Sequence, residues 1–460
     1  MSITVERGGR LNWAQREWFE DLGADSDSEW SFEANFSAIL PGHDLAQGDV
    51  TAGIADLLVR HEGLRSHIVR ANRQDVCSVG ERLAEVIRVT PDEPGDPGEP
   101  GGEAFQAAAR TSFRLHAQWP VLFVLLTAGG RVRRIGVVVD HSAVDGWGMR
   151  VLCRDLERAI RARVKGREPF GGPLESVEQP LDTALWEQGA AGARHQERAR
   201  THWRRQLVTL RDSLGGWSPK AVKRDDLPML HTCRLASRRV AQAAEAVAKA
   251  AGTPVSTGYL LAFGAAVCEA EEAPTTGVFA LSANRLSAAL QGSVRKAVMP
   301  VPVVVPGPRE GAYRDRLAVC AARQLQGHRF ANFDPGVAGP LEDDVLGSLR
   351  GTGASSARFN YIDNALVGSA ANSRAWGRDG FPFGDPAHQG VVRYSPPRPG
   401  GSRYILTVQH RVSGALLTLA WHEDTGWGDV AEAMLWHIED VMVWAASGHE
   451  GPPPEFGRTN

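Results

Sequence analysis

The chain has 460 residues, of which 43% are hydrophobic and 23% charged, a composition typical of a globular protein with a sizeable core. The 51 Lys and Arg residues nearly balance the 54 Asp and Glu residues, so the chain lacks the basic footprint that nucleic acid or an anionic membrane surface requires. No apolar run reaches the roughly 18 residues of a membrane span, the N-terminus lacks the core of a signal peptide, and the widely spaced cysteines without a CxxC pair favour a reducing cytoplasm.

The first half of the chain contains a predicted loop, hairpin and helix in succession. Residues 90–104 hold four prolines, five acidic residues and no basic residue, which predicts a solvated surface loop. Two apolar runs, 120–126 and 135–139, flank a Gly-Gly turn and predict a hairpin in a buried sheet. Over 147–164 apolar residues recur at helical spacing opposite a charged face, which predicts an amphipathic helix packed on that sheet.

The second half alternates between helical and strand patterns. A Gly- and Pro-rich stretch over 166–180 is interpreted as a linker between two lobes, which we place at residues 1–172 and 173–460. The alternation predicts an α/β architecture. The expected helices of the second lobe cover 193–210, 240–251, 258–269 and 430–444, and its expected strands cover 301–305, 404–409 and 415–421.

One segment places a histidine at the end of a strand, because residues 137–148 read VVVDHSAVDGWG. An imidazole at such a strand exit, here His141, is accessible to solvent and can act as a general base near neutral pH. Asp145 is expected to cap the following helix, whose N–H groups could serve an oxyanion, and Gly146 permits close approach of the backbone. The alternative is a strand-end histidine that satisfies one hydrogen bond, followed by an ordinary Asp cap.

This segment resembles the HHxxxDG core of nonribosomal peptide synthetase condensation domains, carrier-dependent acyltransferases whose fold resembles chloramphenicol acetyltransferase. Other segments resemble family patterns in family order: 11–19 (LNWAQREWF), 60–66 (RHEGLRS), 202–207 (HWRRQL), 280–285 (ALSANR) and 359–361 (FNY). The resemblance covers essentially the whole chain. It implies an α/β fold of two acetyltransferase-like lobes, arranged in a V with a central tunnel.

The resemblance also implies roles for the matched residues. His141 corresponds to the catalytic histidine, which takes a proton from the attacking amine or orients it at the thioester carbonyl. Asp145 corresponds to an aspartate that points away from substrate and pairs with an arginine, for which Arg285 is our candidate. Gly146 would keep the donor tunnel open.

Four further residues are candidates for the substrate tunnel. They are Asp140, Ser142, Trp147 and Asn284. For Trp147 a core role is favoured over substrate contact, and Asn284 is also interpreted as structural.

The implied reaction joins a carrier-bound acyl thioester to an amine, giving an amide and a free thiol. It requires no metal or bound cofactor, since the phosphopantetheine arm of the carrier protein delivers the acyl group. We expect a free-standing condensation enzyme of natural-product or antibiotic biosynthesis that meets acyl or peptidyl carriers in trans. The alternatives are an ester-forming acyltransferase with an alcohol acceptor, use of a coenzyme A donor, and a catalytically silent module that recruits a tailoring enzyme.

Two departures from the family pattern bear on the site. Asp140 stands at the place of the first family histidine. Because neighbours on a strand point to opposite faces, Asp140 should not face the substrate side of His141. Its carboxylate could still raise the pKa of the His141 imidazole. After Arg285 the family pattern reads G-x-x-x-N-T-L-P-L-R, whereas the chain reads GSVRKAVMPVPV from Gly292. This second departure implies an unusual substrate geometry.

Overall fold

A computed structural model of the chain describes residues 4–21, 35–70, 72–92, 102–170, 177–219, 229–363, 393–399, 402–411, 413–422, 428–451, 453–454 and 456. The described chain divides into two compact units. The first contains the residues up to Arg194 together with Ala283–Val298. The second contains His195–Ser282 and, from Met299, the rest of the described chain. The boundary expected at residue 172 falls within 171–176, which lies outside the described residues.

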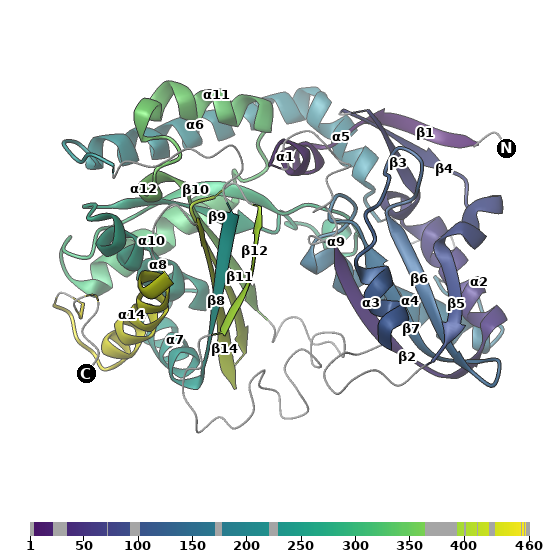
Figure 1. Ribbon diagram of the computed structural model, residues 1–460. Coiled ribbons are helices and arrows are strands. Elements are labelled where there is room, and N and C mark those ends of the chain that lie inside the picture. The colour runs from purple at the N-terminus through teal and green to yellow at the C-terminus, as the bar shows by residue number, and fades with distance from the viewer. Residues whose placement is uncertain are drawn as a thin grey trace. The chain divides into compact units, whose positions relative to one another are not determined.

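The first unit contains a four-stranded and a three-stranded sheet (Figure 1). The larger sheet has the order β2–β7–β6–β5, in which β5 is parallel to β6 and the other neighbours are antiparallel. The smaller sheet has the order β1–β4–β3. The strands are β1 (Val5–Arg10), β2 (Phe36–Ala46), β3 (Ser66–Arg70), β4 (Arg73–Cys77), β5 (Ile87–Pro91), β6 (Val121–Ala128) and β7 (Arg131–Val139), and the helices are α1 (Trp13–Asp21), α2 (Gln47–Arg60), α3 (Gly102–Ala109), α4 (Gly146–Val164), α5 (Pro180–Gln188) and α9 (Ala288–Gln291).

Helices cover both faces of the four-stranded sheet. Successive side chains of a strand point to opposite faces, so the continuous apolar run of β6 supplies two separate cores. Phe123 and its alternate neighbours pack with side chains of α2 and α4 in one buried cluster. Val124 and its alternate neighbours pack with Phe105 of α3 in another. Burial of both faces explains why this strand contains no polar residue before Thr127.

The second unit is built on one seven-stranded sheet with the order β10–β9–β11–β13–β14–β8–β12. The strand β11 is parallel to both β9 and β13, and the other neighbours are antiparallel. The strands are β8 (Met229–Ser237), β9 (Thr276–Ser282), β10 (Met299–Val305), β11 (Ala357–Asp363), β12 (Arg393–Pro399), β13 (Tyr404–Arg411) and β14 (Gly414–His422).

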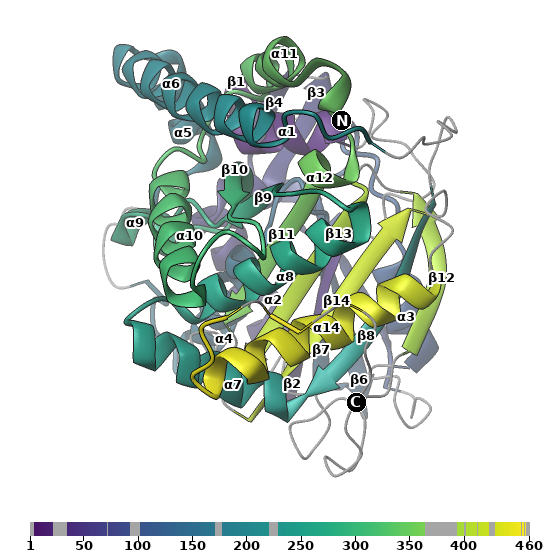
Figure 2. The ribbon, with the colours of Figure 1, turned by 90° about the vertical axis from the view of Figure 1, so that its left-hand side faces the viewer.

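The helices α7, α8, α10 and α14 lie against this sheet, and Figure 2 shows them in front of its strands. The helix α8 is apolar on all sides and almost entirely buried, as expected for a helix inside a core. The long helix α6 (Ala190–Ser213) contains the boundary between the two units. The remaining helices of the second unit are α7 (Arg238–Ala251), α8 (Val255–Glu271), α10 (Tyr313–His328), α11 (Pro335–Leu346), α12 (Gly353–Ser356) and α14 (Gly428–Ala446).

The structure confirms the α/β class, the hairpin of β6 and β7, and the helix after it, which is α4. The helices and strands expected in the second lobe are also confirmed, with ends shifted by a few residues. The V arrangement and the tunnel stay predictions. Residues 93–101 of the loop expected over 90–104 lie outside the described residues. The expectation is wrong at both ends, because Thr90 and Pro91 pair with β6 and α3 begins at Gly102. An edge strand such as β5 tolerates proline, and burial of Phe105 holds the helix.

The five cysteines are free thiols, and all of them are buried. Across the described ranges, no single helix has the length and apolar character needed to cross a membrane; the bent pair α7 and α8 passes that test on length and composition only.

Candidate active site

The loop between β7 and α4 carries His141 and begins with a tight turn. The backbone N–H of Asp140 donates to the Pro120 carbonyl at 2.9 Å, which extends the pairing of the hairpin by one residue. The Asp140 carboxylate then accepts the N–H of Ser142 at 2.8 Å. This local bond fixes the backbone on either side of His141.

The imidazole of His141 is half-buried, and its orientation is set by one hydrogen bond. Its Nδ1 lies 2.7 Å from the carbonyl oxygen of Val144. Because a carbonyl oxygen only accepts, Nδ1 must carry the proton in the neutral ring. The lone pair is therefore on Nε2, which can accept a proton from a substrate.

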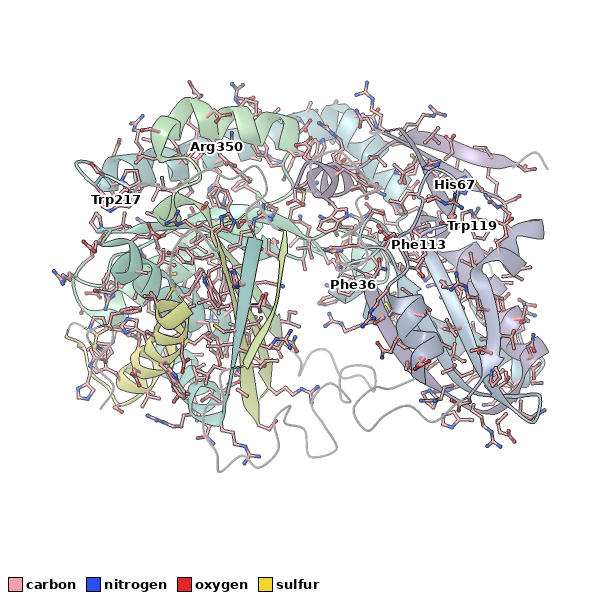
Figure 3. All side chains as sticks on the ribbon, in the orientation of Figure 1. Phe36, His67, Phe113, Trp119, Trp217 and Arg350 are labelled. Atoms are coloured by element: carbon pink, nitrogen blue, oxygen red, sulfur yellow. The ribbon has the colours of Figure 1, made fainter. Side chains whose placement is uncertain are left out.

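Two aromatic rings pack against the imidazole. The Trp18 ring of α1 lies 4.5 Å from it, and the Phe36 ring at the start of β2 lies 4.9 Å from it, both measured between centroids. Figure 3 labels Phe36 on the sheet of the first unit. These contacts help to hold the imidazole in place.

Burial lowers the pKa of His141 to about 4, and the Lys296 ammonium acts in the same direction. The hydrogen bond to Val144 and the carboxylates of Asp145 and Glu17 oppose this shift. The expected upward push by Asp140 is therefore wrong, because desolvation of the imidazole dominates. The Asp140 carboxyl is itself buried, and burial raises its pKa.

Asp145 caps α4 and joins it to the segment Ala283–Val298. Its Oδ1 accepts the N–H of Gly148 at 2.7 Å and Nη2 of Arg285 at 2.8 Å. Its Oδ2 accepts the N–H groups of Ala297 and Val298 at 2.9 and 3.2 Å. Although burial alone would raise it, the pKa of Asp145 is lowered by the Arg285 guanidinium and these N–H groups.

Arg285 organises the same segment from inside. Its Nη1 donates to the carbonyls of Leu290 and Ser293, each at 2.7 Å, and its Nη2 also reaches the carbonyl of Arg295 at 2.9 Å. The Arg285 and Asp145 side chains are only 2% and 1% exposed. A carboxylate with four donors is fully occupied in holding the backbone, so Asp145 has no remaining bond for a substrate.

The other predicted residues lie around this loop. Gly146 is exposed at the first position of α4, and a Cβ there would meet only Phe36 Cε1, at 3.7 Å. Ser142 is buried. Trp147 packs against the core, donates from Nε1 to the Gln291 carbonyl at 2.9 Å and stacks with a neighbouring arginine, which favours its core interpretation.

Asn284 precedes Arg285 and has a left-handed backbone with φ of +50°. Its Nδ2 donates to the Ala297 carbonyl at 3.0 Å, so it closes the same segment that Arg285 fills. Asparagine adopts this conformation more readily than most residues. The contact favours the structural interpretation of this residue.

Sequence reasoning missed four residues near the imidazole. Trp18 lies within the segment 11–19, but the resemblance of that segment implies no role for this residue. Phe36 opens a short apolar run that carries no motif. Lys296 donates to Glu17 Oε2 at 2.8 Å, across 279 residues of chain. The only signal for Lys296 was its place in a segment that departs from the family pattern.

Within the described part of the chain, no group of three or more His, Cys, Asp or Glu side chains could hold a metal ion. The chemistry that these residues themselves offer is that of a neutral imidazole with a free lone pair. Its loop is anchored by a buried ion pair.

No protein-family model matches the chain. CymA of Salinispora arenicola, which is named as a nonribosomal peptide synthetase, is 31% identical over 204 residues, or 44% of this chain. The dimodular nonribosomal peptide synthase of Bacillus subtilis is 33% identical over 171 residues, or 32% of this chain. The matches span only 2% and 6% of the lengths of these two relatives.

Solved structures match nearly the entire chain. The structure on condensation domain-mediated chain release from the enacyloxin polyketide synthase has a TM-score of 0.70 at 17% identity, over 97% of this chain and 84% of that one. The X-domain from teicoplanin biosynthesis has a TM-score of 0.68 at 19% identity, over 99% of both chains. The chain thus has the fold of solved condensation domain structures, and the two curated relatives are named as nonribosomal peptide synthetases.

The first unit carries the HxxxDG segment on the loop between β7 and α4. Its histidine and aspartate have different surroundings: the imidazole keeps an unprotonated nitrogen, while the carboxylate is saturated by backbone and arginine donors. This difference between His141 and Asp145 is the basis for a functional proposal.

Proposed function

We propose that the chain is an acyltransferase that joins a carrier-bound acyl or aminoacyl thioester to an amine. The observation that carries this proposal is the tautomer of His141, which presents an unprotonated Nε2 beside two aromatic rings. The fold and the nonribosomal peptide synthetase relatives support a condensation role.

In the proposed step, the amine nitrogen attacks the thioester carbonyl carbon while Nε2 of His141 accepts or orients its proton. A C–N bond forms, the C–S bond breaks, and the proton passes to the leaving thiolate, which departs as the free thiol of the phosphopantetheine arm. The hydrogen bond from Nδ1 to Val144 holds the ring and supports the positive charge that develops on it. The thioester supplies the driving force, so the protein contributes positioning and a base.

The geometry supports a structural role for Asp145 and Arg285. Both side chains are buried, and they bind each other and the segment Ala283–Val298. We propose that they position the loop of His141 and take no part in proton transfer. Gly146 is proposed to leave space for the acyl donor, since only one side-chain atom lies within contact of its missing Cβ.

An alcohol acceptor would give an ester by the same step, because Nε2 of His141 can accept a proton from either nitrogen or oxygen.

A silent recruiting module is favoured by one finding. The X-domain in complex with OxyB from teicoplanin biosynthesis matches 97% of this chain with a TM-score of 0.65. The unprotonated and fixed imidazole supports the catalytic reading over the silent one.

The test is to incubate the chain with acyl-loaded carrier proteins and separate pools of amine and alcohol acceptors. Mass spectrometry follows both the acyl group on the carrier and the product. Amide formation that requires an added amine supports the proposal, and ester formation moves it to the alcohol reading. Stable binding of carriers together with a tailoring enzyme, without transfer to any acceptor, would overturn it in favour of the recruiting module.

A further inference from the structure

A partly buried ion pair lies close to the site and is not part of the HxxxDG segment. Lys296 Nζ donates to Glu17 Oε2 at 2.8 Å and to the Val298 carbonyl at 3.0 Å. The Lys296 and Glu17 side chains are 3% and 15% exposed. Lys296 lies in the segment after Gly292 that departs from the family pattern.

Each end of this pair is tied to His141 by a neighbour in sequence. On α1, Glu17 precedes Trp18, whose ring packs against the imidazole. In the segment Ala283–Val298, the carbonyl of Arg295 accepts the N–H of Asp145 at 3.2 Å, and the N–H of Ala297 donates back to its carboxylate at 2.9 Å. Lys296 therefore stands between two residues that hold the loop of His141.

We propose that the Glu17–Lys296 ion pair is a positioning device for His141, which fastens α1 and its Trp18 ring against the imidazole and keeps a positive charge beside it. Its importance for turnover rests on the proposed function. Its effect on the imidazole does not.

The charges of Lys296 and Glu17 also act on the pKa of His141. Apart from burial, the Lys296 ammonium is the strongest influence on the pKa of His141, and it lowers that pKa because a second positive charge nearby is unfavourable. The opposing charges are Glu17 on α1 and Asp145 on the loop itself, and Asp145 is in turn bound to Arg285. Phe36 on β2 contributes an uncharged ring. The two members of the pair thus act on His141 in opposite directions.

The experiment is a pH titration of the full chain labelled with carbon-13 at histidine, followed by NMR. The His141 signal is identified by its loss in His141→Asn. The variants are Lys296→Met and Glu17→Gln, and the control is Lys249→Met, which removes an exposed ammonium in the last turn of α7. Circular dichroism at each pH verifies that the protein is folded.

Lys296→Met is expected to raise the pKa of His141 by about one unit, since a neighbouring positive charge is gone. Glu17→Gln is expected to lower it, since the ammonium is then unopposed. Lys249→Met should leave it unchanged. Lys296→Met could fail to fold because the Glu17 carboxylate loses its cation. The double variant Glu17→Gln/Lys296→Met removes both charges and should still raise the pKa of His141, since Lys296 has a larger effect on it than Glu17.

A merely structural pair would lower thermal stability in both single variants and leave the titration of His141 where it is in the wild-type chain. That result would overturn the proposal. Shifts in opposite directions support it even if no acyl transfer is found, in which case only the proposed function fails. Where transfer is found, the acid limb of its pH profile should move with each variant in the same direction as the titration.

Discussion

At the scale of single residues, the imidazole of His141 owes its proposed role to one carbonyl and its burial. The Val144 carbonyl fixes the proton on Nδ1, and burial keeps the ring neutral at physiological pH. A surface histidine would be protonated over much of the range below its ordinary value of about 6.5. In this chain the base is available well below that value.

This predicts an unusual pH profile for acyl transfer. Because the folded pKa of His141 is about 4, kcat/KM calculated for the unprotonated amine should stay level as the pH falls from 8 through 6.5 and decline only as it approaches that pKa. The measurement is the rate of carrier unloading across pH, with circular dichroism to exclude unfolding. A decline centred near pH 6.5 would mean that the imidazole titrates like an exposed one.

Arg285 is predicted to be essential for stability. Arg285→Met would leave the buried Asp145 carboxylate without its cation, a loss that typically costs about 3–5 kcal/mol. Urea unfolding measures it. The control is Arg161→Met on α4, which breaks the exposed pair with Glu157 and should cost less than about 1 kcal/mol. Equal losses in both variants would contradict the anchoring role of Arg285.

At the scale of elements, the start of α4 is where strand, helix and the segment Ala283–Val298 meet. A Cβ on Gly148 would lie 2.9 Å from the Arg295 carbonyl oxygen and 3.0 Å from Val144 Cγ2. A Cβ on Gly146, two residues earlier, has one neighbour at 3.7 Å. Gly148 is thus needed for the close approach of this segment to α4, whereas a methyl group at Gly146 can be accommodated.

Gly148→Ala is therefore expected to lower the free energy of unfolding by about 1–3 kcal/mol, the usual cost of overpacking. Gly146→Ala should change it by less than about 0.5 kcal/mol, because its methyl group makes an ordinary contact. Urea unfolding of both variants tests the difference. If Gly146→Ala were the more destabilising, the assignment of the close contact to Gly148 would be wrong.

Local patterns predicted the elements with strong periodicity. The apolar runs of β6 and β7 flank a turn, and the amphipathic repeat of α4 follows, so their positions could be predicted from neighbouring residues alone. The strand β5 could not be predicted, because its last residues lie in a Pro- and acid-rich stretch. Only its pairing with β6, more than thirty residues away, makes it a strand.

The site divides in the same way. The motif and the family resemblance pointed to His141, Asp145 and Arg285 because spacing within known segments carries that information. The contacts of Glu17 and Lys296 join residues far apart in sequence, and no local pattern records them. The first compact unit likewise takes in Ala283–Val298 through such long-range bonds, which a single expected boundary does not include.

At the scale of the whole molecule, several histidines are buried in the neutral form. Burial lowers the pKa of His202 and of His437 to about 4, as it does for His141. In the unfolded chain these groups take up protons below about pH 6.5. Their folded pKa values are depressed, so the stability they confer is complete above pH 6.5 and is lost as the pH falls toward 4.

The variant His437→Leu tests this linkage on α14. Between pH 7 and 5, the free energy of unfolding of the wild-type chain should fall by about 2 kcal/mol more than that of the variant. In the wild-type chain His437 becomes protonated on unfolding, whereas leucine in the variant takes up no proton. Urea unfolding at both pH values measures the difference. Identical pH dependence in the two proteins would show that His437 is not buried in its neutral form.

The most direct test of the proposed acyl transfer is the single-turnover rate at which an acyl-loaded carrier loses its acyl group to an added amine. The wild-type chain is compared with His141→Asn, whose amide can still donate to the Val144 carbonyl but cannot act as a base, and with His116→Gln, an exposed histidine in the same unit. We predict a rate that falls by about 100-fold or more in His141→Asn and stays at the wild-type level in His116→Gln. Equal rates in all three proteins would contradict a catalytic role for His141.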